Sequence, residues 1–391
     1  MQGNKFRFTI KRFLITLFII LIVIVGLLFY FFNFRQSSTT TSNNKNRKKS
    51  IQVINSPGNS NYKSIISNGK YKESSARNTV VSTESDLNAK SFEASLNDLS
   101  KKYFSPKKYL FQEGQYLSSS LLSNWLGRYS SSNQSGLNPP KSPNNSKNPS
   151  PNYIQSIEEN DFVKQTSNNK VSLKGLTIGI AMNTEYNYNR TQDGPSYTKK
   201  ISKQQMVAEG KTAANKVLNR LRQNNRIPKN LPILLVMYSN APSNNDLTGG
   251  YPYAYYLSRS GTKIGQWNNP KIRNIVFPKI ESDNSKLGRQ DNTAFLNFEN
   301  QVESYFPNIS SATAQAHYVN NNLSGLNINV NTNFYSTSEI NAFSSYLSQI
   351  TSRYFREKIP IKISVNASGN LVAVISKGAK GGFKITYLYN Y

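Results

Sequence analysis

An uninterrupted apolar run near the amino end is the feature that most limits how this chain can fold. Residues 13–34 read FLITLFIILIVIVGLLFYFFNF and contain no charged side chain. At about 1.5 Å per residue, a helix of this length covers about 33 Å, enough to cross a hydrocarbon core of about 30 Å. A cleavable signal peptide has a shorter apolar core that ends in small residues, whereas this run ends in bulky aromatic ones. We therefore expect a retained single-pass signal anchor, with a buried core helix as the less favoured alternative.

The charges on either side of the run predict its orientation. The basic tail 1–12 carries Lys5, Arg7, Lys11 and Arg12 directly before the run. Arg35 follows the run at once, but the next basic residues come only after a polar gap, at Lys45, Arg47, Lys48 and Lys49. The positive-inside rule then places the tail in the cytoplasm. We expect a protein of the cell membrane whose remaining domains are extracellular.

The residue composition removes several classes of chemistry. The chain has no cysteine, and His317 is its single histidine. Disulfides, thiolate nucleophiles and Cys/His zinc sites are therefore excluded. His317 lies in the predicted strand AQAHY, where we expect a hydrogen-bonded structural role. We expect neither a metal nor a cofactor.

Two polar segments predict the domain organisation. Residues 35–60 are polar and lack periodicity, as in a disordered tether. Residues 130–164 begin with a stretch rich in Asn, Ser and Pro, which cannot sustain a helix or an inner strand and predicts an interdomain linker. The globular part then divides into a small unit, 61–129, and a main domain, 165–391.

Hydrophobic periodicity predicts an α+β fold with antiparallel or mixed sheets. Apolar residues recur at helical spacing over 90–103, 118–126, 202–223, 293–306 and 336–354. Short apolar or alternating runs predict strands at 176–182, 233–238, 262–267, 274–277, 313–318, 326–330, 361–365, 371–375 and 383–389. The order of strands and helices is similar in the two halves of the main domain, which suggests an internal duplication.

Several segments resemble the CamS family, the sex-pheromone precursor lipoproteins of Gram-positive bacteria. They include DLSKKYFSPKKYLFQEGQYL (98–117), GLTIGIAMN (175–183), AEGKTAANKVLNRLR (208–222) and YFPNISSATAQAHY (305–318). The resemblance implies an extracytoplasmic protein held at the membrane, of two-part α/β character, without an established enzymatic activity. The family carries a lipid-modified cysteine after its signal sequence, which this chain lacks. The apolar run is expected to replace the lipid as the anchor.

Catalysis by carboxylates is the alternative function. Glu299 and Glu303 are four residues apart on a predicted helix, and Glu281 and Asp283 lie in a polar loop. Paired carboxylates hydrolyse glycans, so a cell-envelope glycan hydrolase is conceivable. Carboxylates at helical spacing are more often a solvated face. Ser-x-x-Lys spacings are scattered through the chain as chance supplies them, so we assign no catalytic residue.

The charge of the chain favours a binding function instead. Lys and Arg number 48 against 20 Asp and Glu, a formal net charge of +28. Outside a cell this charge attracts anionic envelope polymers through a screened force. Tyr251, Tyr253 and Tyr255 alternate in GGYPYAYYL, so in an extended strand they share one face that could stack on sugar rings or on a protein partner. A buried sheet face is the alternative. The anchor and the lack of a groove-reading motif argue against nucleic acid. We expect a non-enzymatic protein that binds an envelope polymer, peptide or protein.

Overall fold

The computed structural model describes residues 51–54, 61–67, 70–77, 79, 86–166, 170–242, 250–279, 286–305, 311–333, 336–355 and 358–388. The predicted anchor 13–34, the tail 1–12 and most of the tether 35–60 lie outside them. The described residues of that tether, 51–54, form a strand that pairs with residues 64–67, so the tether was predicted too long. None of the helices in the described ranges has the length and apolar character needed to cross a membrane. The described residues belong to one compact unit, Ile51–Tyr391.

The first sheet joins segments that the sequence assigned to separate units. Within the described residues it has eight strands in the order β1-β2-β4-β5-β6-β9-β10, with β3 paired to β2. The strands are β1 (Ile51–Ile54), β2 (Lys63–Ser67), β3 (Lys70–Tyr71), β4 (Leu110–Glu113), β5 (Ile154–Gln165), β6 (Val171–Met182), β9 (Ile233–Ser239) and β10 (Tyr251–Ser258). The predicted small unit 61–129 is therefore wrong as a separate body, because its strands continue the sheet of the predicted main domain.

The predicted linker 130–164 is also too long. Its last residues form β5, a buried strand that pairs antiparallel with β4 on one side and with β6 on the other. The preceding loop is fastened by Asn138, which is fully buried. Its side-chain amide donates to Leu126 O and Ile154 O, and its Oδ1 accepts from the backbone N–H of Tyr153 and Ile154. The prolines end at Pro151, so they do not interrupt the strand.

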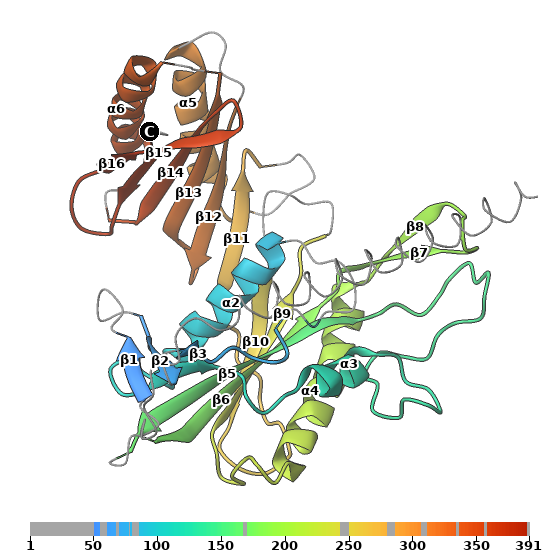
Figure 1. The fold of residues 1–391 in the computed structure, drawn as a ribbon. Helices are drawn as coiled ribbons and strands as arrows, with labels where there is room; N and C mark the ends of the chain where they lie inside the picture. The colour runs from blue at the N-terminus through green and yellow to red at the C-terminus, as the bar shows by residue number, and fades with distance from the viewer. Residues whose placement is uncertain are drawn as a thin grey trace, which may run out of the picture. The chain divides into compact units, whose positions relative to one another are not determined.

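Helices cover both faces of this sheet (Figure 1). On one face, α2 (Asp86–Ser100) packs Phe92, Leu96 and Leu99 against β6 and β9, the apolar face that the periodicity predicts. The helix lies close to β6, because a Cβ added at Gly179 would lie 2.5 Å from the Phe92 ring. On the other face lie α3 (Ser119–Leu126) and α4 (Lys203–Gln223). Their caps, Ser118 and Ser202, accept hydrogen bonds from the first turn of each helix.

A second sheet follows in the chain. Its six described strands are β11 (Ile272–Phe277), β12 (Ser311–Val319), β13 (Asn322–Thr332), β14 (Ile361–Ala367), β15 (Asn370–Lys377) and β16 (Lys384–Tyr387), in that spatial order. Helices α5 (Arg289–Tyr305) and α6 (Thr337–Tyr354) contact each other and cover one face of this sheet (Figure 1). The capping box of Ser336 and Glu339 is present at the start of α6.

The two sheets repeat one pattern of strand pairing. In the first, the hairpin β5–β6 leads through α4 to β9, which lies parallel to β6 and forms a hairpin with β10. In the second, the hairpin β12–β13 leads through α6 to β14, which lies parallel to β13 and forms a hairpin with β15. The chain is thus a mixed α+β fold in which one ββαββ arrangement occurs twice.

Local predictions failed in two further places. Residues 262–267, predicted as a strand, form a loop. A separate two-stranded sheet of β7 (Glu185–Asn189) and β8 (Ser196–Lys200) was not predicted. Stacked tyrosines hold it, with the rings of Tyr186 and Tyr188 5.9 Å apart.

Arg222 fixes the carboxyl end of α4 to two loops of the first sheet. Its side chain is buried, with the residue only 4% exposed. Its guanidinium donates to the backbone oxygens of Lys229, Leu231, Ser258 and Gly261, and to Ser258 Oγ. The cation is therefore satisfied by carbonyl dipoles and a hydroxyl.

We predict that Arg222→Met lowers the free energy of unfolding by about 3–5 kcal/mol, because it leaves several buried oxygens without donors. Urea unfolding followed by circular dichroism measures the change. Lys216→Met, at an exposed position of the same helix, is the matched control and is expected to change stability by about 0.5 kcal/mol or less. A loss of less than about 1 kcal/mol of unfolding free energy in Arg222→Met would show that the hydrogen bonds of the guanidinium contribute little to stability.

Candidate functional sites

The tyrosines that the sequence singled out lie on β10 but do not share one face. A bulge between Pro252 and Ala254 makes Tyr253 an extra residue in the pairing of β10 with β9. Tyr253 packs on the α4 side, where its hydroxyl would lie 2.5 Å from a Cβ added at Gly210. Tyr255 lies on the α2 side. The expectation of a common face is therefore wrong, while the ligand-binding role of these residues stays a prediction.

Tyr253 has the surroundings of a core residue. Burial raises its pKa above the usual range for a tyrosine. Its hydroxyl is buried and has no hydrogen-bond partner among the described residues. Of the three tyrosines, Tyr251 and Tyr255 are therefore better placed to meet a partner.

Tyr251 and Tyr255 each have a cation over the ring. The Arg273 guanidinium lies 4.2 Å from the ring centroid of Tyr251, and Lys102 Nζ lies 5.4 Å from that of Tyr255. The rings of Tyr103 and Tyr255 are 6.2 Å apart, and Arg259 acts electrostatically on Tyr103. We call the residues Lys102, Tyr103, Tyr255 and Arg259 the tyrosine–basic surface. Tyr251 and Arg273 do not belong to it, because Tyr251 pairs with Ser239 and acts electrostatically on Tyr253, on the α4 side of the sheet. Cations held over aromatic faces combine positive charge with flat apolar area.

A buried carboxyl pair lies on β5. Glu159 accepts the backbone N–H groups of Tyr116 and Leu117, at 3.1 Å and 2.7 Å, and so holds the loop after β4. Asp161 is 1% exposed and hydrogen-bonds to Glu159. Burial and the charge of Glu159 raise the pKa of Asp161 to about 10, and burial also raises the pKa of Glu159 against the lowering effect of the N–H bonds. Asp161 therefore carries the proton that the two carboxyl groups share.

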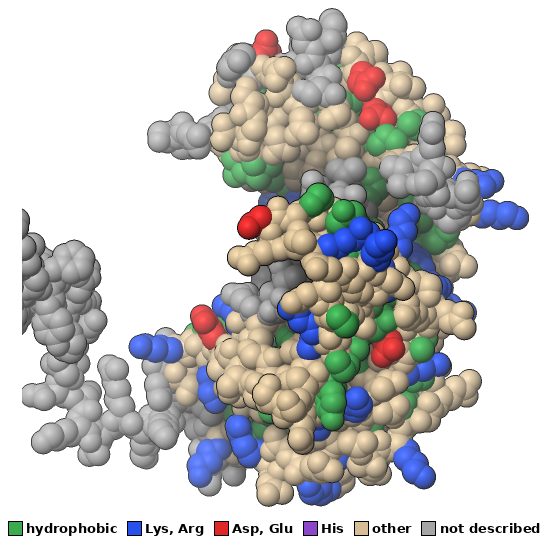
Figure 2. Space-filling view, turned by 90° about the vertical axis from the view of Figure 1, so that its right-hand side faces the viewer, with side chains coloured by type: hydrophobic (Ala, Val, Ile, Leu, Met, Phe, Trp, Pro, Cys, Tyr) green, Lys and Arg blue, Asp and Glu red, His purple; other side chains and the backbone are tan. Residues whose placement is uncertain are grey.

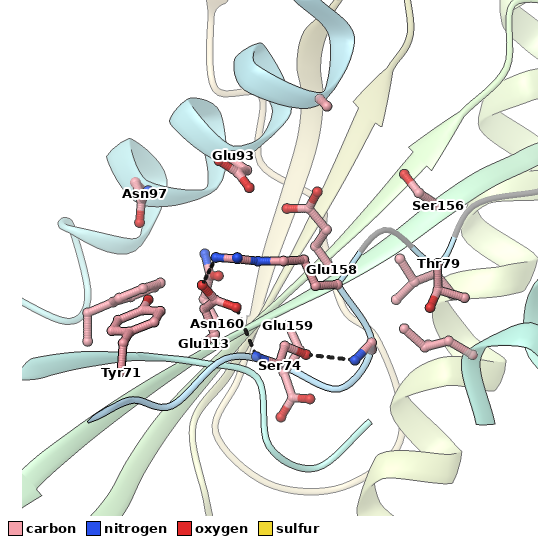
Figure 3. Close-up of a pocket in the computed structure, with 16 residues that line it drawn as sticks. Tyr71, Ser74, Thr79, Glu93, Asn97, Glu113, Ser156, Glu158, Glu159 and Asn160 are labelled. Atoms are coloured by element: carbon pink, nitrogen blue, oxygen red, sulfur yellow. Dashed lines mark hydrogen bonds and ion pairs between the residues drawn. The ribbon is translucent and has the colours of Figure 1, made fainter. Parts of the chain in front are cut away.

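A pocket lies in front of this pair. It has a volume of about 330 Å³ and is bounded by α2, by β4 and β5, and by the segment around Arg77. Glu113, labelled in Figure 3, lines the pocket, and its carboxylate forms an ion pair with Arg77, which lines the pocket too. Glu113 also accepts the backbone N–H of Ser74 at 2.9 Å, so its charge is already compensated.

The carboxylates weighed for glycan hydrolysis do not line this pocket. Glu299 and Glu303 lie on α5 of the second sheet, where burial and the charge of Glu303 raise the pKa of Glu299. Glu281 and Asp283 lie outside the described residues. Within those residues, no three acidic or histidine side chains are grouped so that they could hold a metal ion. His317 Nδ1 lies 2.8 Å from Asn274 Oδ1, and burial lowers its pKa, in keeping with the expected structural role.

Sequence reasoning missed the carboxylates of β5 because it assigned them to the linker. A signal was present in IQSIEENDFVKQ, where Glu158, Glu159 and Asp161 stand among apolar residues in a chain poor in acids. Acidic residues set among apolar ones in this way indicate a strand with buried carboxyl groups rather than a linker.

The raised pKa of Asp161 predicts a pH dependence of stability. In the folded protein Asp161 holds a proton up to about pH 10, whereas in the unfolded chain it loses that proton near pH 4. The stabilisation is complete below the unfolded pKa and is lost as pH rises towards the folded one, by at most about 1.4 kcal/mol per pH unit. In Asp161→Asn, the free energy of unfolding measured with urea is expected to fall less between pH 5 and pH 9 than in the wild type. Asp193→Asn, at an exposed position, is expected to show the same fall as the wild type, and equal slopes in all three proteins would contradict the assignment.

Comparisons with known proteins agree with this fold. The model of the family described as CamS sex pheromone cAM373 precursor matches residues 71–381. A crystal structure of a sex pheromone precursor from Lactobacillus salivarius subsp. salivarius is 43% identical, with a TM-score of 0.81, and the match covers 87% of this chain and 100% of that one. The C-terminal domain of the sex pheromone staph-cAM373 precursor from Staphylococcus aureus is 26% identical, with a TM-score of 0.63, over 78% of this chain and 97% of that one. No curated protein matches the chain. With its residues 71–381 covered by the family model, the chain belongs to the CamS family.

Proposed function

We propose that this protein is a non-enzymatic binding protein of the cell envelope, whose tyrosine–basic surface binds an anionic envelope polymer. The observation that carries the proposal is the placement of Lys102 over the ring of Tyr255, beside Tyr103 and Arg259. Wall polymers of Gram-positive bacteria combine sugars or polyols with phosphate or carboxylate groups. Aromatic faces stack on the former, and guanidinium and ammonium groups attract the latter.

The distribution of charge supports the same partner. Ion pairs within the described part of the chain are few and join Arg77 to Glu73 and Glu113, and Lys101 to Asp98. With 48 Lys and Arg against 20 Asp and Glu, at least 28 basic side chains have no acidic residue to pair with. Figure 2 shows Lys and Arg side chains spread over one face of the molecule, with only a few acidic groups between them. Such a surface attracts a polyanion over about 10 Å at moderate ionic strength.

Binding fits the geometry better than glycan hydrolysis does. Glycosidases use two accessible carboxyl groups about 5–10 Å apart, one of them protonated. Glu159 and Asp161 are hydrogen-bonded to each other and buried, and Glu113 is paired with Arg77. These three carboxylates serve the structure, so they give the hydrolase alternative no support.

The proposal includes attachment to the membrane by residues 13–34, with the folded unit outside the cell. The length and the aromatic end of the apolar run support it, as does the absence of the cysteine that lipid attachment requires. Residues 35–50 then separate the bilayer from the folded unit, whose first described strand is β1 at Ile51–Ile54. The polymer that we propose as partner lies outside the cell membrane, on the same side as the folded unit.

Binding to purified Gram-positive cell walls is expected to depend on salt and on the tyrosine–basic surface. The solved relative covers 87% of this chain, so residues 51–391 are suitable for sedimentation with walls. Raising sodium chloride from about 50 to 300 mM shortens the Debye length and should weaken binding several-fold. Lys102→Glu with Arg259→Glu should weaken it further, about tenfold at low salt.

The matched control is Lys211→Glu with Lys216→Glu, which makes the same charge change at exposed positions of α4 on the other face of the sheet. This variant is expected to lose much less affinity. Equal losses in the two double variants would show that only net charge matters, and binding that does not change with salt would contradict an electrostatic mechanism.

Attachment and orientation are tested in whole cells. A full-length protein with a tag after Tyr391 is expected in the membrane fraction, with the tag accessible to protease added to intact cells after wall removal. A protein that lacks residues 13–34 is expected to leave the membrane fraction. A tag that becomes accessible only after lysis would contradict the proposed orientation.

A further inference from the structure

Arg220, in the last turn of α4, is a cation without a counter-charge. Its guanidinium makes no hydrogen bond and no ion pair within the described part of the chain, and its Nη1 is buried without a partner. Arg222, two residues further on, directs the same kind of group at carbonyl oxygens and a hydroxyl. Burial lowers the pKa of Arg220, because it disfavours the charged form. A partly buried and unpaired guanidinium is a strong donor for an anion.

The ring of Trp125 holds this guanidinium in place. Arg220 Cζ lies 5.1 Å from the ring centroid, and Trp125 is only 4% exposed in the core that α3 and α4 cover. The face of the ring attracts the cation. It does not take up the five N–H donors of a guanidinium, so Arg220 keeps its capacity to bind an acceptor.

A pocket lies at this point between α3 and α4. It has a volume of about 300 Å³, at the small end of the range for ligand sites. Among the described residues that line it, Arg220 alone is charged, and Gln223 and Asn224 add polar groups. The remaining walls are apolar and come from α3, α4 and the residue before the cap of α3: Leu117, Leu121, Trp125 and Leu221.

The end of α4 does not neutralise Arg220. The last carbonyl groups of a helix carry partial negative charge. Two of them accept the backbone N–H of Asn224, and that of Arg222 accepts a hydrogen bond from Lys229 Nζ. Arg226 follows the helix and adds a further positive charge at the same end. The surroundings of the pocket therefore favour an anion.

The combination of one cation with apolar walls decides the class of ligand. A guanidinium matches a carboxylate, which can accept two parallel N–H bonds from it. A polyanion would place its further charges against leucine side chains, which is unfavourable. A single carboxylate attached to a short apolar group fits both parts of the pocket.

We propose that this pocket binds a carboxylate carried on a short apolar group, either a free monocarboxylic acid or the C-terminal residue of a peptide. Arg220 is the ion partner of the carboxylate, and the apolar group lies against Leu121 and Leu221. The pocket lies on the α3 and α4 side of the first sheet, whereas the tyrosine–basic surface lies on the α2 side. Either proposal can therefore fail without the other.

Tryptophan fluorescence of residues 51–391 tests the proposal, because Trp125 lines the pocket. The chain has one other tryptophan, Trp267, so a Trp267→Phe background makes the signal specific. Hexanoate with hexanamide, and N-acetyl-leucine with N-acetyl-leucinamide, are pairs of probes that differ in the charge of one group. We expect a saturable change with at least one carboxylate and none with the amides.

The two carboxylate probes distinguish the sources of the ligand. Tighter binding of hexanoate identifies a free acid, and tighter binding of N-acetyl-leucine identifies the end of a peptide. Failure of both carboxylates to bind, or equal binding of a carboxylate and its amide, would overturn the proposal.

Arg220→Met locates the binding, because it keeps an apolar side chain over Trp125 and removes the charge. It should weaken binding of the carboxylate about tenfold or more. Since the guanidinium is unpaired, the variant should unfold at the same urea concentration as the wild type or at a higher one, unlike Arg222→Met.

The matched control is Lys211→Met, at an exposed position on about the opposite side of α4 at about 3.6 residues per turn. It removes the same charge and should leave binding unchanged. Equal binding by wild type and Arg220→Met would contradict the proposal. A loss of stability in Arg220→Met as large as that in Arg222→Met would also contradict it, since the protein itself would then be using the guanidinium.

Discussion

The pairing of β5 with its two neighbours holds the first sheet together. On one side β5 pairs with β4, which brings in the strands before residue 114, and on the other it pairs with β6, which leads to β9 and β10. Without β5 these two groups of strands would be unconnected. The same strand carries Ser156, Glu158, Glu159 and Asp161. The architecture of the first sheet and the chemistry of its pocket therefore depend on one segment.

Much of the fold follows from the sequence where local signals agree with one another. Helix α6 has a capping box, a helical period of apolar residues and a buried face, and it forms where the pattern predicts. Strand β5 was missed because its polar residues resemble a linker, and its polarity is tolerated only because Asp161 holds a proton and Glu159 accepts N–H groups from a distant loop. The orientation of Tyr253 was missed because a bulge depends on the partner strand, which local sequence does not reveal. Local sequence patterns do not reveal such effects, because they depend on contacts with residues far away in the chain.

The two candidate sites carry charged groups of opposite sign. Cations over aromatic rings stand at β10, at one edge of the first sheet, while the carboxylates stand at β4 and β5, farther along the same sheet. A net charge of +28 acts over long distances, whereas the carboxylates act only within their pocket.

The short contact between α2 and β6 has a consequence for the pocket. Because Gly175 and Gly179 have no side chains, the rings of Phe104 and Phe92 lie directly on the sheet, and Leu96 is drawn down with them. Glu93 follows Phe92 in the same helix, so its height above the sheet depends on the missing side chain of Gly179. The distance between the α2 wall and the β5 wall of the pocket thus depends on a residue that does not line it. An alanine at Gly179 would push α2 away from the sheet and move Glu93 away from the carboxylates of β5.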